Sequence, residues 1–65
     1  MNTTTLTPDE ATITVSLTEL HTLNNALNEV CNGLHIEEFA TRMGVEREEA
    51  AALLEQIHAL IGRMR

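Results

Sequence analysis

A single cysteine, Cys31, occurs among the 65 residues, so the chain cannot form an internal disulfide. A domain of this length buries only about 60% of the surface that its unfolded form exposes, and its core supplies roughly 3–5 kcal/mol of stability. Small domains usually gain further stability from disulfides, a bound metal or another subunit. With a disulfide excluded, the sequence predicts a chain that is stabilised by contact with another molecule.

Charge and hydropathy restrict what that molecule can be. Ten acidic residues outnumber four basic ones, and the formal net charge of −6 opposes contact with phosphate backbones and anionic membranes. No apolar run approaches the roughly 18 residues of a membrane span. The start of the chain also lacks the basic and apolar segments of a secretory signal. We therefore expect a cytoplasmic protein with no membrane contact, for which nucleic acid is an unfavourable partner.

The first eleven residues differ in composition from the rest. Residues 1–11 contain four threonines, and Leu6 is their one large aliphatic residue besides the initiator methionine. Such a segment buries too little apolar surface to offset the entropy of ordering, so we expect a flexible tail. Residues 12–65 are predicted to form a single helical domain. That domain opens with a short strand at 12–16, where β-branched apolar residues alternate with polar ones.

A helix is predicted to begin directly after Ser16. Ser16 and Glu19 have the spacing of a capping box, in which each side chain binds the other residue's backbone N–H group. Apolar residues then recur every three or four positions, as expected for one face of a helix, and Gly33 should end it in a left-handed conformation. This first apolar stripe consists of Leu20, Leu23, Leu27, Val30 and Leu34.

Two further helices follow in the pattern. A short one is expected from Ile36 to Met43, where Gly44 ends it, and a longer one from Glu46 to Met64. The longer helix has a broad apolar face. Its members are Leu53, Leu54, Ile57, Leu60, Ile61 and Met64. The predicted fold class is therefore mainly α, a domain of three helices preceded by one short N-terminal β-strand.

Residues 36–57 resemble a helix-turn-helix motif. The small residue Ala40 is followed four positions later by the turn glycine, Gly44, which is the spacing of that family. The resemblance implies a helix-turn-helix-like corner, and in DNA-binding members the second helix contacts the bases. Here that helix begins with residues 46–49, of which three are glutamates that repel a phosphate backbone. We therefore expect a corner that serves packing or protein contact.

Residues 12–31 resemble the opening of ribbon-helix-helix proteins, in which a short strand leads into a capped amphipathic helix. In that family two chains pair their strands antiparallel, and outward side chains of this ribbon enter the major groove. The two resemblances together imply an alternative function, a DNA-binding transcriptional regulator of helix-turn-helix or ribbon type. Its candidate nucleic-acid contacts are Thr12, Thr14, Arg42 and Arg47.

The strand at 12–16 has no evident partner elsewhere in the chain. Its backbone N–H and C=O groups need one, and a second copy of the chain is the simplest source. We therefore predict a two-fold homodimer in which this strand pairs with its equivalent, with the alternative that the segment merely extends the tail or lies along its own helices. The residues expected at the interface with self or another protein are Ile13, Val15, Leu20, Leu23, Leu27, Leu54, Ile57 and Ile61.

Residues capable of catalysis or metal binding are few and scattered. Among the three histidines, only His35 lies four positions from another metal-binding residue, Cys31. A thiol with a neighbouring base also needs a third orienting group, which the sequence does not offer. We expect no cofactor, no metal and no enzymatic activity. The function expected is a small acidic protein-interaction module, homodimeric and binding an unidentified protein.

Overall fold

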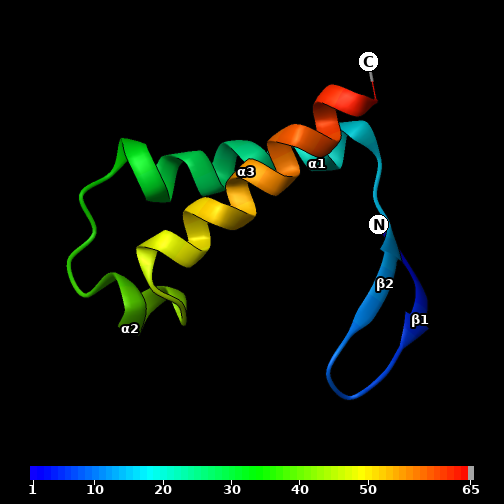
Figure 1. Ribbon diagram of the computed structural model, residues 1–65, viewed down its shortest axis with the longest axis horizontal. Helices are drawn as coiled ribbons and strands as arrows, with labels where there is room; N and C mark the ends of the chain where they lie inside the picture. Colours follow the sequence, from blue (N-terminus) through cyan, green and yellow to red (C-terminus); the bar gives the residue numbers. More distant parts are fainter. Residues whose placement is uncertain (65) are drawn as a thin grey trace.

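The computed structural model describes residues 1–64 and shows a mainly helical chain preceded by a β-hairpin (Figure 1). Arg65, the last residue of the predicted domain, lies outside the described residues. The predictions of a mainly α fold and of three helices are confirmed. The elements in order are β1 (Asn2–Leu6), β2 (Ala11–Thr14), α1 (Leu17–Asn28), η1 (Glu29–Gly33), α2 (Phe39–Met43) and α3 (Arg47–Arg63).

The hairpin joins β1 and β2 in antiparallel register, from Asn2 opposite Thr14 to Leu6 opposite Ala11. Its loop is closed by the N–H group of Thr7, which donates to the Glu10 carbonyl at 2.9 Å. The prediction of one strand without a partner in the chain is therefore wrong. We expected residues 1–11 to be a flexible tail, yet they contain β1. Because every residue of the hairpin is exposed, backbone pairing accounts for this strand and burial does not.

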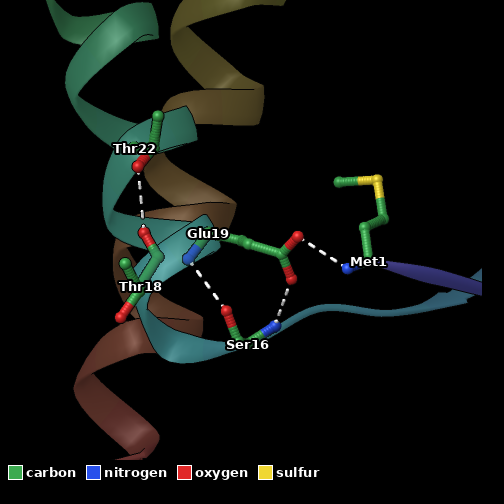
Figure 2. Close-up of polar contacts among 5 residues, drawn as sticks. All are labelled: Met1, Ser16, Thr18, Glu19 and Thr22. Carbon is green, nitrogen blue, oxygen red and sulfur yellow. Dashed lines mark hydrogen bonds and ion pairs between the residues drawn. The ribbon is translucent and has the colours of Figure 1, made fainter.

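The capping box at the start of α1 is confirmed. The Glu19 N–H group donates to Ser16 Oγ at 3.1 Å, and the Ser16 N–H group donates to Glu19 Oε1 at 2.9 Å (Figure 2). The second carboxylate oxygen, Oε2, accepts a hydrogen bond from the Met1 ammonium group at 2.6 Å. One carboxylate therefore binds both the first turn of α1 and Met1, the residue directly before β1.

The end of the first helix differs from the prediction. It continues beyond α1 as the π-helical segment η1, in which the Leu34 N–H group donates to the Glu29 carbonyl at 2.8 Å. Gly33 has no positive φ angle, so the expected left-handed glycine stop is wrong. Instead, the segment closes with a π-type hydrogen bond to a carbonyl five residues earlier, and the extended backbone at Leu34 ends it.

The helix α2 begins at Phe39, three residues after the predicted start. Glu38 has a φ angle of 56°, a left-handed conformation that a right-handed helix cannot include. The predicted end is confirmed, because Gly44 has a φ angle of 81° and its N–H group donates to the Ala40 carbonyl at 2.8 Å. The bounds of α3 lie within one residue of those predicted.

The core is thin. Among residues 1–64, the buried side chains are Leu20, Cys31, Phe39, Ala50 and Ile61. Three of them form one cluster, in which Cys31 from η1 meets Phe39 from α2 and Ala50 from α3. The remaining two belong to α1 and α3, which run antiparallel and pack against each other, whereas the hairpin extends away from the helices (Figure 1). Within the described part of the chain, no helix combines the length and apolarity needed to cross a bilayer.

The contacts of Glu19 predict a stability that depends on pH. Hydrogen bonds from the Met1 ammonium group and from the Ser16 N–H group lower the pKa of Glu19 from 4.5 to about 2. A carboxyl whose pKa is lower in the folded state stabilises the fold above pH 4.5, and this contribution disappears as the pH falls towards 2. We expect Glu19→Gln to lower the thermal unfolding midpoint at pH 7 but not at pH 2.

Circular dichroism across this pH range measures the effect. The exposed Glu55, which forms no hydrogen bond within residues 1–64, provides the matched Glu55→Gln control. Equal destabilisation by the two substitutions at pH 7 would show that Glu19 has no special role.

Candidate interaction site

An exposed apolar stripe runs along α3. Its members follow each other at intervals of four, three and four residues, which places them on one face of a helix. Leu53, Leu60 and Met64 are 49%, 43% and 46% exposed, and Ile57 between them is half-buried. We call these four residues, Leu53, Ile57, Leu60 and Met64, the α3 stripe.

A second apolar line on α3 is covered by the chain's other helical segments. Ala50 and Ile61 are 3% and 2% exposed, and Leu54 between them is half-buried. Because successive residues of an α-helix are rotated by about 100°, Leu53 lies roughly 60° around the helix from Ala50. The apolar arc of α3 is therefore wider than the strip that α1, η1 and α2 cover, and the α3 stripe is the part left open.

Charged groups border the open stripe along one edge. Glu49, Gln56 and Arg63 are spaced seven residues apart, and all three are exposed. The two ends of this edge thus carry opposite charges. Within residues 1–64, neither Glu49 nor Arg63 forms an ion pair with another side chain.

Arg47 is bound into the corner between the helices. Its Nη1 donates to the Cys31 carbonyl at 2.8 Å and to the Val30 carbonyl at 3.4 Å. The guanidinium carbon also lies 4.4 Å from the centroid of the Phe39 ring. The carbonyls at the end of a helix lack partners within the helix and attract a cation, so Arg47 supplies what the end of η1 needs. Sequence reasoning assigned this side chain only a contact with nucleic acid.

The other candidate nucleic-acid contacts lie on separate parts of the molecule. Thr12 and Thr14 are exposed on β2, and Arg42 is exposed on α2. The Oγ1 atom of Thr14 lies 3.5 Å from that of Thr4 on the neighbouring strand. The hairpin and α2 are at opposite ends of the chain's longest dimension (Figure 1), so these residues do not form one surface.

The residues predicted for the interface divide into three groups. Leu20 and Ile61 are buried in the chain's own core, whereas Leu23 and Ile13 are 39% and 43% exposed. The half-buried remainder consists of Val15, Leu27, Leu54 and Ile57. Of the α3 stripe, the sequence prediction included only Ile57. The sequence pattern places its other members on one broad apolar face. Their regular spacing, offset by one position from Leu54 and Ile61 of the buried line, is the signal that distinguishes them.

A shallow groove of about 470 Å³ lies on another side of the helix pair, between Asn24 and Asn28 of α1 and His58 of α3. The Oδ1 atom of Asn24 is buried there without a hydrogen-bond partner. The groove offers amide and imidazole groups, but no serine, threonine or cysteine lines it. Within residues 1–64, no three histidine, cysteine or acidic side chains come close enough together to hold a metal ion.

The position of Arg47 predicts that it stabilises the fold. Arg47→Ala removes charge-assisted hydrogen bonds to two carbonyls and a cation–π contact, so we expect it to lower the free energy of unfolding by about 2 kcal/mol. Arg42→Ala makes the same change of charge at an exposed site and should have little effect. Urea denaturation of the two variants measures the difference. Equal stability of both would contradict the assigned role of Arg47.

Comparison with known proteins provides no family for this arrangement. No protein-family model matches the chain, and neither a curated protein nor a solved structure matches it significantly. The open α3 stripe with its charged edge is therefore the feature on which a functional conclusion must rest.

Proposed function

We propose that the chain is a small acidic protein-interaction module and that the α3 stripe is its binding surface. The observation that carries this proposal is the exposure of three large apolar side chains on one helix face, each between 43% and 49%. Scattered apolar residues are normal at protein surfaces, but a continuous apolar strip is typical of a contact with another protein. Such a stripe suits a partner helix that lies along α3.

The open shape of the molecule supports a binding role. The accessible surface is 5162 Å², whereas a compact protein of this mass exposes about 4100 Å². The difference, about 1000 Å², is comparable to the roughly 800 Å² that each partner contributes to a standard protein interface. The radius of gyration of 13.1 Å also exceeds the value of about 11 Å expected for a compact chain of this length. The chain thus exposes more surface than a compact fold of its mass, part of it on the hairpin and part of it on α3.

The corner between α2 and α3 supports a structural use of the helix-turn-helix-like geometry. Gly44 supplies the left-handed turn, and Phe39 is buried just before it. In the proposed module, this corner sets the direction in which α3 leaves the core, and hence which face of α3 stays open. Because Arg47 already binds two carbonyls, the start of α3 presents mainly glutamates to an incoming ligand.

The left-handed Gly44 also favours the second candidate function, a DNA-binding regulator that uses this corner. We predict that the chain does not bind duplex DNA even at low salt, because carboxylates dominate the start of α3. Fluorescence anisotropy with a labelled random duplex measures this. Binding that weakens steeply as salt increases would contradict the interaction module and support the regulator.

The α3 stripe predicts the effect of two surface substitutions. We expect Leu53→Gln combined with Leu60→Gln to leave the helical circular dichroism spectrum unchanged in form but to abolish complex formation. The size of the complex is measured by gel filtration of an extract of the cells that make the protein. Leu34→Gln, at a 55% exposed apolar residue outside the stripe, is the matched control. The proposal fails if the unmodified chain elutes at its own mass of 7.2 kDa in that extract.

A further inference from the structure

We propose that the partner on the α3 stripe is the α3 helix of a second copy of this chain, lying antiparallel to the first. The inference rests on the proposed function, because it uses the same stripe. It goes further by naming the occupant and its direction. A two-fold axis close to Gln56 relates the two helices, so each copy presents the same surface to the other.

The two leucines of the stripe are self-complementary about this axis. With a rise of about 1.5 Å per residue, Leu53 and Leu60 lie about 5 Å on either side of a midpoint next to Gln56. In the antiparallel arrangement, Leu53 packs beside the partner's Leu60, and Ile57 packs near its own equivalent. The two exposed leucines of the stripe in each copy thereby cover those of the other.

The charged edge selects the antiparallel direction. Glu49 and Arg63 lie seven residues before and after Gln56, or about 10.5 Å along the helix. An antiparallel pair therefore brings Glu49 opposite the partner's Arg63 twice, once at each end. A parallel two-fold pair would place the two charged edges on opposite sides of the interface, so neither Glu49 nor Arg63 would meet an opposite charge on this edge of the partner. Charged residues at such flanking positions are known to set the orientation of paired helices.

The pairing within the hairpin supports a second copy on the helices. The strand 11–14 already pairs with residues 2–6, which removes the reason given by the sequence for a dimer formed through that strand. Among the described residues, the α3 stripe is then the apolar surface with a self-complementary pattern of charge.

Charge reversal tests both the occupant and the direction. The purified chain is measured by sedimentation velocity in 0.15 M salt, which screens the general repulsion between acidic copies. We expect a dimer at micromolar concentrations. Glu49→Arg or Arg63→Glu alone replaces two attractive pairs by two repulsive ones and should weaken the dimer roughly tenfold. The double variant Glu49→Arg with Arg63→Glu restores the attraction and should return the dissociation constant to within about threefold of the unmodified chain.

A matched control separates pairing from effects on the helix itself. Glu48 lies in the same helical turn as Glu49 and is also exposed, but it points about 150° away from the α3 stripe. Glu48→Arg changes the charge near the helix start in the same way, so it should leave the dimer unaffected. Circular dichroism of every variant confirms that the helices are retained, because all three sites are exposed.

Each of the following three outcomes overturns the inference. A purified chain that stays monomeric shows that the partner is a different protein. A dimer that is insensitive to both charge reversals is not an antiparallel α3 pair, and one that dissociates on Ile13→Asp is formed by the hairpin. The proposed function is tested separately. If the complex in the cell extract is lost with the stripe variant while the purified chain is monomeric, the interaction module stands and the second copy does not.

Discussion

The guanidinium group of Arg47 lies where three segments of the chain meet. It binds carbonyls at the end of η1, stacks over Phe39 of α2 and belongs to the first turn of α3. An arginine is suited to this place because it keeps its charge and has several donors in a fixed plane. With the corner held in this way, Ala50 is buried against Cys31 and Phe39, and Ile61 is buried further along α3. The rest of the apolar arc of α3 then has nothing within residues 1–64 to cover it.

Size explains why the chain leaves this surface open. Among the residues that the structure describes, the core contains five buried ones, of which Ala50 is small and Phe39 is the only aromatic. Burial of apolar surface contributes about 25 cal/mol per Å², so a core of this size gives limited stability. A second layer of helices supplied by another molecule would enlarge the core without lengthening the chain. The openness of the fold and its proposed role in binding thus follow from the same shortage of apolar surface to bury.

Local signals in the sequence predicted the helices well. The capping box places the start of α1 because Ser16 and Glu19 are three residues apart and need no distant contact. The hairpin was missed because residues 2–6 have no alternating apolar pattern. The available signal was a Pro-Asp turn between two threonine-rich runs, at Pro8 and Asp9. The left-handed Glu38 and the π segment η1 have no such local signature.

The candidate site was predictable only in part. The sequence identified the apolar face of the third helix but could not divide it, because the division depends on where α1 packs. Arg47 contacts carbonyls 16 and 17 residues earlier in the chain, so its role depends on the tertiary fold. By contrast, the seven-residue spacing of Glu49, Gln56 and Arg63 can be read directly from the sequence. The structure adds that the apolar residues beside this edge stay exposed, so the charged edge borders an open surface.

The most direct test is an isotope-filtered nuclear Overhauser experiment on a mixture of ¹³C-labelled and unlabelled chains. Within one helix, Leu53 and Leu60 are about 10.5 Å apart along the axis, too far for a strong signal between their methyl groups. An antiparallel pair of α3 helices predicts a methyl signal between Leu53 of one copy and Leu60 of the other. Leucine methyl shifts that do not change with concentration, with no signal between copies, would contradict it.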